Sequence, residues 1–246
     1  GGRKNHAMTE HLPATPHPAL DEPAPNGLSR HGADASPPSA PAAESEDPSR
    51  RRPKPGERRA QILQALAAML EQPHPERITT AALAARLGVS EAALYRHFAS
   101  KAQMFEGLID FIEQSVFTLV GQLHQRVEAG EMAADAVAPQ MVALLLQFGE
   151  TNPGMTRVMV GDALVYENER LQARMNQFFD KIEAALRQAL RDRFLAAGDP
   201  APTAQAAIQS GVMAAFAVGR LQRFVRSGFR LRPTDHLAES LVLLSR

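Results

Sequence analysis

Residues 79–101, TTAALAARLGVSEAALYRHFASK, constrain the fold most, because they predict two short helices joined by a tight turn. Thr80 can cap a first helix, and Gly88 ends it. Ser90 can cap a second helix directly after that turn. Two short helices in this arrangement are typical of a helix-turn-helix DNA reader.

The apolar spacing of this segment predicts which sides of the two helices are buried. Leu83 and Leu87 lie four positions apart on the first helix, and Leu94 and Phe98 repeat that spacing on the second. Small or hydrogen-bonding side chains near a helix N-terminus let the helix enter a major groove. The residues left facing outward are Ser90, Glu91, Ala93, Arg96 and His97.

Helical periodicity dominates the rest of the chain, and no convincing period-two stretch is present. Ser100 can cap a helix from Lys101 to about 128, which at about 40 Å is long enough to join a DNA-binding head to a second body. The sequence therefore predicts an all-α fold of about nine helices. The other helices are expected at about 57–71, 132–149, 167–196 and 202–226, and from Asn152-Pro153 and Pro233.

Positive charge is concentrated on the predicted DNA reader. The chain has no formal net charge, yet residues 50–101 carry ten basic against four acidic side chains, a net charge of +6. This distribution is expected of a surface that meets phosphates, although a solvated basic linker would have the same composition.

The first 56 residues are expected to lie outside the fold. Residues 1–7, GGRKNHA, precede Met8 and are typical of an expression-tag remnant, and residues 8–56 are rich in proline and almost free of large apolar side chains. The predicted organisation is a disordered tail (1–56), a DNA-binding domain (57–101) and a helical dimerisation and partner-binding domain (102–246).

Several classes of function are disfavoured by what the sequence lacks. The absence of cysteine rules out disulfides and thiolate metal sites. No apolar run approaches the roughly 18 residues of a membrane span, and no signal-peptide core is present, so a cytoplasmic protein is expected. The histidines show no metal-site spacing, and no nucleophile elbow or phosphate loop appears, so we expect neither an enzyme nor a cofactor. Glu167 and Glu169 are expected on an exposed helix start.

A stripe of small residues predicts a close helix–helix contact. The residues Ala207, Gly211, Ala215 and Gly219 follow one another at four-residue spacing. Packing inside the monomer would explain this stripe, and so would a homodimer interface. Helix-turn-helix proteins usually read two half-sites through a two-fold axis, which favours the dimer.

The block LGVSEAALYRHFASKAQMF resembles the TetR family of bacterial DNA-binding proteins. Further blocks, among them LLLQFGETNPGMTRVMVGDAL and RFVRSGFRLRPTD, are similar to the nucleoid occlusion factors within that family. The resemblance covers about residues 58–235. It implies a dimer that binds palindromic chromosomal sites in double-stranded DNA, associates with the nucleoid, and antagonises the division protein FtsZ by capturing its C-terminal tail.

The resemblance also implies site residues. Phe111 and Leu144 match apolar positions for the FtsZ tail, between the fourth and fifth helices, while Gln147 and Thr151 stand beside them where the family has a small residue and an arginine. The positions that match DNA-facing residues are Thr79, Thr80, Ser90, Ala93, Tyr95, Arg96, His97 and Lys101. Of these, Tyr95, His97 and Lys101 suit phosphates, and Ala93 suits base edges.

The alternative function is that of a ligand-responsive TetR-type repressor with an apolar pocket in the helical body. A stripe of methionine and phenylalanine can line such a pocket, although it is more often plain core. The candidate lining residues are Met141, Phe148, Met155, Met159 and Met175.

Overall fold

The computed structural model describes residues 53–72 and 77–246, and the residues described are helical, with no strand among them. Residues 51–246 form one compact unit. The expected disordered tail therefore falls almost wholly outside the described residues. The predicted all-α fold class is confirmed.

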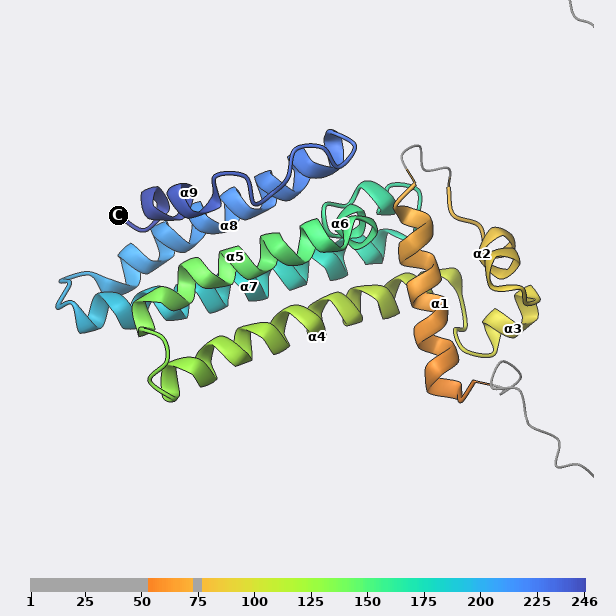
Figure 1. The fold of residues 1–246 in the computed structure, drawn as a ribbon, viewed down its shortest axis with the longest axis horizontal. Coiled ribbons are helices and arrows are strands. Elements are labelled where there is room, and N and C mark those ends of the chain that lie inside the picture. Colours follow the sequence, from red (N-terminus) through yellow and green to blue (C-terminus); the bar gives the residue numbers. More distant parts are fainter. Residues whose placement is uncertain (1–52, 73–76) are drawn as a thin grey trace, which may run out of the picture. The chain divides into compact units, whose positions relative to one another are not determined.

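Nine α-helices are present in the described residues (Figure 1). Their bounds are α1 Pro55–Leu70, α2 Thr80–Leu87, α3 Glu91–Tyr95, α4 Lys101–Glu128, α5 Val137–Thr151, α6 Pro153–Met159, α7 Glu169–Ala196, α8 Pro202–Arg226 and α9 Leu237–Leu244. Two short 3₁₀ turns, η2 Ala134–Ala136 and η3 Asp162–Leu164, precede α5 and follow α6. We refer to α1–α3 as the head and to α4–α9 as the body.

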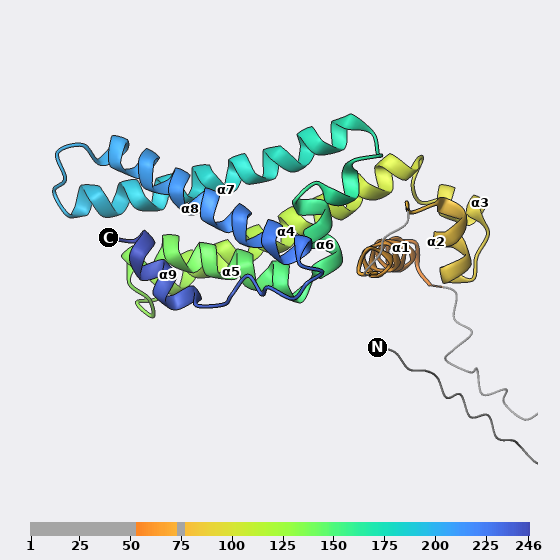
Figure 2. The same ribbon diagram turned by 90° about the horizontal axis from the view of Figure 1, so that it is seen from above.

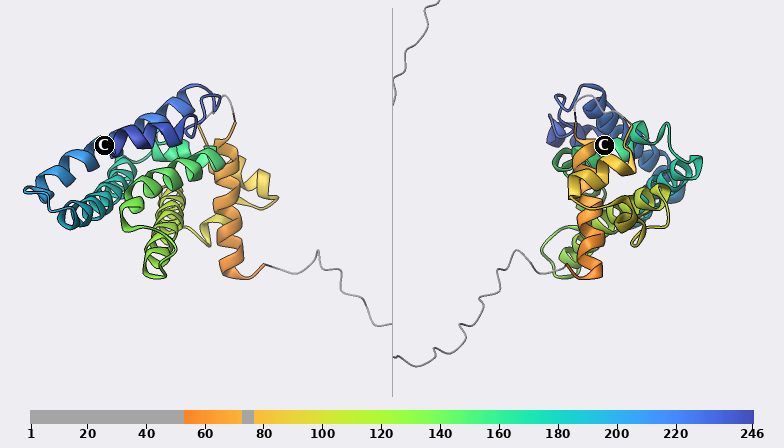
Figure 3. Two further views of the ribbon diagram at one scale, coloured as in Figure 1. Left: turned by 60° about the vertical axis from the view of Figure 1, so that its left-hand side comes forward. Right: turned by 90° about the vertical axis from the view of Figure 1, so that its right-hand side faces the viewer.

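The body is built around four long helices. Helix α5 packs against α4, α7 and α8, and α7 also packs against α4 and α8 (Figures 1 and 2). Helix α9 packs against α8. The right-hand view of Figure 3 looks onto the head, with α1 and α2 in front of the body helices. A continuous buried cluster runs from Ile62 of α1 through Leu108 of α4 to Leu221 of α8, so the head and the body share one core.

The head is tied to the body through α6. Gly154 of α6 lies against α1 so closely that a Cβ on it would stand 2.0 Å from the carbonyl oxygen of Ala67. Three residues later, the Arg157 guanidinium donates a 3.1 Å hydrogen bond to the carbonyl oxygen of Leu70, which α1 leaves without a helical partner. Both contacts join α6 to the last turns of α1.

Several predicted helix ends needed correction. Thr79 rather than Thr80 caps α2, since its hydroxyl accepts the hydrogen bond from the Ala82 amide. Helix α3 ends at Tyr95, so Phe98 is buried from the turn that follows the helix. Helix α5 begins at Val137 instead of 132. Ser100 caps α4 as predicted, by accepting from the Gln103 amide.

Candidate nucleic-acid interface

The turn between α2 and α3 has the geometry of a helix-turn-helix motif. Gly88 closes α2 in the left-handed region with a φ of 66°, which strains any residue bearing a Cβ. Two residues later, the Ser90 hydroxyl accepts from the Ala93 amide and starts α3. Leu94 is fully buried and Phe98 nearly so, while Ser90, Glu91 and Arg96 are exposed. The predicted inward and outward sides of α3 are therefore confirmed, except that His97 and Ala93 are half-buried.

One part of the predicted DNA-facing set forms a hydrogen-bonded cluster between α2 and α3. The Thr80 hydroxyl donates to the Glu91 carboxylate at 2.9 Å, and the Tyr95 hydroxyl donates to Thr80 at 3.4 Å. Glu91 thus orients Thr80, and Thr80 in turn accepts from Tyr95, a residue that is 45% exposed. Thr79, directly before this cluster, is exposed at the start of α2.

A second part gathers on the other side of α3. Ala93, Arg96 and His97 line a surface pocket of about 300 Å³. Arg58 and the start of α1 also line this pocket. The Arg59 guanidinium of α1 donates to the carbonyl oxygen of His97 at 3.0 Å and lies 4.2 Å from the centre of the Phe98 ring. Helix α1 therefore holds the turn that carries His97.

Lys101 is placed differently from the other candidates. Its ammonium donates to the carboxylate of Glu167 at 2.7 Å, and the side chain of Glu167 is only 8% exposed. The Nε atom of Arg77, just before α2, lies 4.0 Å from the same carboxylate oxygen. The expectation that Glu167 belongs to an exposed helix start was wrong, because α7 begins at Glu169 and Asn168 caps it.

Sequence reasoning missed Arg77 and Glu167 as parts of this surface. In the sequence, Arg77 contributes only to the positive charge of residues 50–101. Glu167 lies 66 positions from Lys101, and no local pattern indicates a partner at that separation. Only the packing of the connection between α6 and α7 beside the first turn of α4 brings the two residues together (Figure 2).

The two predicted partner-binding residues lie on neighbouring helices of the body. Phe111 of α4 is 46% exposed, whereas Leu144 of α5 is half-buried against the core. Gln147 and Thr151 are exposed on α5. The large exposed fraction of Phe111 is unusual for a phenylalanine within a long core-forming helix.

The small-residue stripe of α8 is only partly covered inside the monomer, where a Cβ on Gly211 would lie 3.6 Å from a carboxylate oxygen of Glu183 in α7. The buried face of α8 carries Ala206, Ser210, Met213 and Ala217, one or two positions away from the stripe. A Cβ on Gly219 would meet no atom within 4 Å. Ile208 and Val212, which flank the stripe, are 64% and 50% exposed. Packing inside the monomer therefore accounts for only part of the stripe, and the homodimer interface stays a prediction.

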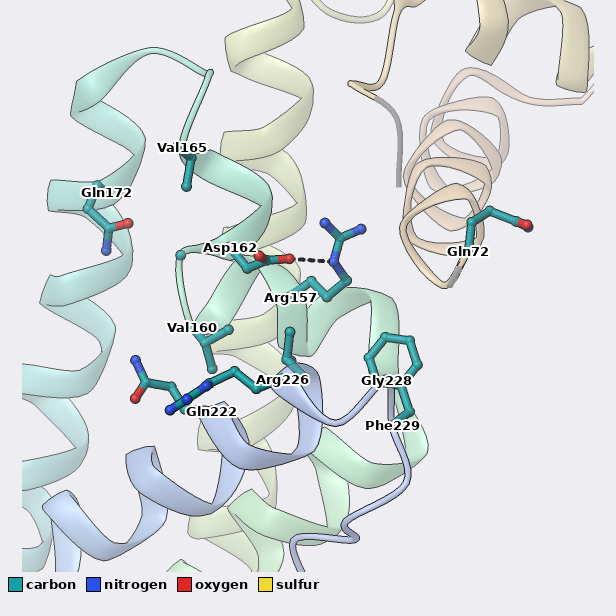
Figure 4. A pocket seen from close by; sticks show the side chains of 12 residues that line it. Gln72, Arg157, Val160, Asp162, Val165, Gln172, Gln222, Arg226, Gly228 and Phe229 are labelled. Carbon is teal, nitrogen blue, oxygen red and sulfur yellow. Dashed lines mark hydrogen bonds and ion pairs between the residues drawn. The ribbon is translucent and has the colours of Figure 1, made fainter. Parts of the chain in front are cut away.

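The candidate ligand-lining residues form ordinary core. Met141, Met155, Met159 and Met175 are buried, and Phe148 packs against them in the same cluster. The pocket in Figure 4, a surface cavity of about 540 Å³ between α1, α6, α7 and α8, is lined by other residues. Inside this pocket, the Nε atom of Arg157 lies 2.7 Å from the carboxylate of Asp162. The most buried charge of the pocket is therefore already neutralised.

Among the described residues, no helix is long and apolar enough to cross a bilayer, and no group of histidine and acidic side chains has the arrangement of a metal site.

Comparisons with known proteins support the architecture described above. Residues 62–108 match the family described as bacterial regulatory proteins, tetR family, and residues 137–246 match an SlmA-like family described as a tetracyclin repressor-like C-terminal domain. Among solved structures, the transcriptional regulator FadR from Bacillus subtilis in complex with stearoyl-CoA is similar, with a TM-score of 0.59 and 14% identity over 76% of this chain and 97% of that one. A putative TetR-family transcriptional regulator from Rhodococcus sp. is similar with a TM-score of 0.58. Its sequence is 18% identical, and the match covers 77% of this chain and 100% of that one.

The capped helix pair, the long α4 and these matches define a DNA-binding regulator of the TetR class. Relatives narrow the assignment. Nucleoid occlusion factor SlmA of Aliivibrio fischeri (strain MJ11) is 48% identical over 198 residues, which cover 78% of this chain and 96% of the relative. SlmA of Escherichia coli (strain K12 / DH10B) is 50% identical over 179 residues, which cover 72% of this chain and 88% of the relative. The chain belongs to the family of nucleoid occlusion factor SlmA.

Proposed function

We propose that this protein binds palindromic chromosomal sites as a homodimer and, from the nucleoid, antagonises the polymerisation of FtsZ in the cytoplasm. The observation that carries the proposal is the identity of about half to SlmA, which extends over the head and the body alike. The proposed functional division falls at residue 101, with DNA contacts before it and dimer and partner contacts after it.

In this proposal α3 enters the major groove. Ala93 and Ser90 approach base edges, because small side chains at the start of the helix allow close contact. Thr79, Tyr95, His97 and Lys101 contact phosphates and set the register of the head on the duplex. Arg96 points away from the buried Leu94 and reaches the groove or its edge, and the hydrogen bond from Thr80 to Glu91 holds the two helices in register.

The proposed dimer forms through α8 and α9. Ile208 and Val212 expose apolar surface beside a stripe of small residues, and such surface is stabilised when a second copy covers it. Val242 and Leu243 of α9, the helix that packs against α8, are 57% and 65% exposed and would add to the apolar surface of the interface. A two-fold axis here would present two heads to two half-sites.

The proposed FtsZ contact lies on α4 and α5. Phe111 supplies an exposed aromatic anchor, and Leu144 supplies apolar surface from the neighbouring helix. Gln147 and Thr151 differ from the family pattern beside these residues, so each single contact is expected to be weak. A DNA-bound array of dimers facing a polymer of FtsZ compensates through effective concentration.

The test is sedimentation of FtsZ polymers with GTP, with and without this protein and a cognate duplex. We expect the protein with DNA to reduce the pelleted FtsZ far more than the protein alone. Phe111→Ala should abolish this reduction while leaving DNA binding intact. Leu195→Ala is the matched control, since Leu195 of α7 is 50% exposed and belongs to neither α4 nor α5.

Two outcomes would reject the proposal. FtsZ polymers that pellet normally in the presence of protein and cognate DNA would remove the division function. If a small molecule then released the protein from its DNA, the ligand-responsive repressor would be the better assignment. Equal effects of Phe111→Ala and Leu195→Ala would move the FtsZ contact elsewhere.

A further inference from the structure

The ion pair between Lys101 and Glu167 occupies the position where a DNA phosphate is expected. Lys101 is the first residue of α4, and the N-terminus of a helix carries a partial positive charge. A cation at that position is unfavourable unless an anion lies beside it. In this structure the anion is the Glu167 carboxylate, at 2.7 Å from the ammonium.

Three features indicate that this pair is more than a surface salt bridge. The Glu167 side chain is 8% exposed and that of Lys101 is 22% exposed, so both charges are partly withdrawn from water. Arg77 provides a second cation at 4.0 Å from the same oxygen. Glu167 comes from the body, in the connection between α6 and α7, whereas Arg77 belongs to the segment that leads into α2.

We propose that Glu167 acts as an internal substitute for a DNA phosphate, and that DNA binding exchanges its carboxylate at Lys101 for a phosphate oxygen. The inference rests on the proposed DNA contact of Lys101. Because Arg77 stays beside Glu167, the displaced carboxylate keeps a cationic neighbour, which lowers the cost of the exchange.

The exchange makes Glu167 a restraint on DNA affinity. The displaced carboxylate, held beside Arg77, still lies about 4.5 Å from the incoming phosphate oxygen, and Coulomb's law at that separation in bulk-water dielectric gives a repulsion equivalent to about a fivefold change in affinity. The local charge of Arg77, Lys101 and Glu167 is +1, and it becomes +2 when the carboxylate is removed. A higher local charge also steepens the dependence of binding on salt.

The exchange also connects DNA occupancy to the body. While DNA is absent, the carboxylate ties the connection between α6 and α7 to the first turn of α4. Once a phosphate takes its place, that tie is lost. Tyr166, next to Glu167, is 78% exposed and is well placed to report the change.

The first experiment measures binding to a duplex of random sequence by fluorescence anisotropy over a range of salt concentrations. We expect Glu167→Gln to bind about fivefold tighter than wild type, with a salt slope steeper by up to about one unit. Glu169→Gln is the matched control, because Glu169 is exposed, lies two residues away and has no ion pair among the described residues. It should change affinity by about twofold or less. In a Lys101→Ala background, Glu167→Gln should not raise the affinity for the duplex.

The results that would overturn the inference are specific. If Glu167→Gln binds as wild type does, the carboxylate does not compete with phosphate. If it binds more weakly, the carboxylate positions Lys101 instead. If the gain persists without Lys101, the effect is general charge. A wild-type protein that binds no duplex at all would reject the proposed DNA-binding function, which is a separate failure.

Two further measurements remain informative if Glu167→Gln does not fold. Lys101→Ala in the otherwise wild-type protein should change the salt slope by well under one unit, because the pair is already neutral, and a full unit would contradict the exchange. The chain contains no tryptophan, so Tyr166→Trp introduces a single fluorescent reporter. Its emission should shift on adding duplex, and an unchanged emission would also contradict the release of Glu167.

Discussion

Gly154 sets how closely the body approaches the head, and Gly154→Ala should destabilise the protein. The added Cβ would stand 2.0 Å from the carbonyl oxygen of Ala67, 3.0 Å from the carbon of the same carbonyl and 3.1 Å from Cγ of Glu71. A carbon atom and a carbonyl oxygen normally approach to about 3.3 Å, so α1 or α6 must move by more than about 1 Å. The obstacle is backbone, which has no alternative rotamer.

The expected cost follows from two opposed effects. Overpacking of this kind costs about 3 kcal/mol at the upper end of the usual range, and the better helix propensity of alanine returns up to about 1 kcal/mol. We therefore expect a net loss of about 2 kcal/mol in the free energy of unfolding. The shift of α1 should also displace Arg157 from the carbonyl oxygen of Leu70, because that hydrogen bond spans the same contact.

Urea unfolding followed by circular dichroism measures this change. Gly121→Ala is the matched control, since Gly121 lies in α4 and a Cβ there would meet no atom within 4 Å. The control should gain about 0.5–1 kcal/mol from helix propensity alone. If Gly154→Ala is as stable as Gly121→Ala, the close contact between α1 and α6 does not exist in solution.

Three other predictions concern the dimer, the DNA reader and acid stability. Replacing Gly211 and Ala215 together with Glu should give a monomer in light scattering, and a mutant that stays dimeric would place the interface elsewhere. Ala93→Phe should abolish binding to a cognate duplex while sparing much of the non-specific binding, because it blocks base edges rather than phosphates; an equal loss of both would contradict a reading role. Burial would raise the pKa of Glu113, but hydrogen bonds from Lys181 and Arg174, with their charges, hold it below its ordinary 4.5. A lowered pKa means that this network stabilises the fold fully above pH 4.5 and loses its effect as the pH falls through the lowered value. Glu113→Gln should thus destabilise near neutral pH and have little effect in acid, as urea unfolding across pH would show, whereas a constant difference would contradict this role.

Helix ends were predictable where a local signal dominates. Ser100 and Lys101 start α4 as expected, because the serine has no competing partner and Met104, Phe105 and Leu108 in the first turns are buried. At Thr79 and Thr80, two equivalent capping residues stand side by side, and the choice depends on Glu91. That carboxylate takes the Thr80 hydroxyl, which leaves Thr79 to cap α2.

The start of α5 could have been found in the sequence. A helix beginning near 132 would hold Pro139 in its interior, where a proline lacks its amide donor and clashes with the preceding turn. The observed start at Val137 moves Pro139 into the first turn, where it is tolerated. By contrast, the pairing of Lys101 with Glu167 depends on tertiary packing over 66 positions, and neither residue shows it locally.

In α3 and the turn after it, the residues that anchor the segment differ from those proposed to face the DNA, and this separation affects how the DNA-reading surface can change during evolution. Leu94 and Phe98 supply the buried contacts of this segment, and neither of them is exposed to a ligand. Ser90 supplies the cap, so substitutions at the exposed Arg96 carry little cost in folding. Related proteins can therefore acquire new target sequences through a few surface substitutions, while the helix that carries them remains anchored by the same two side chains.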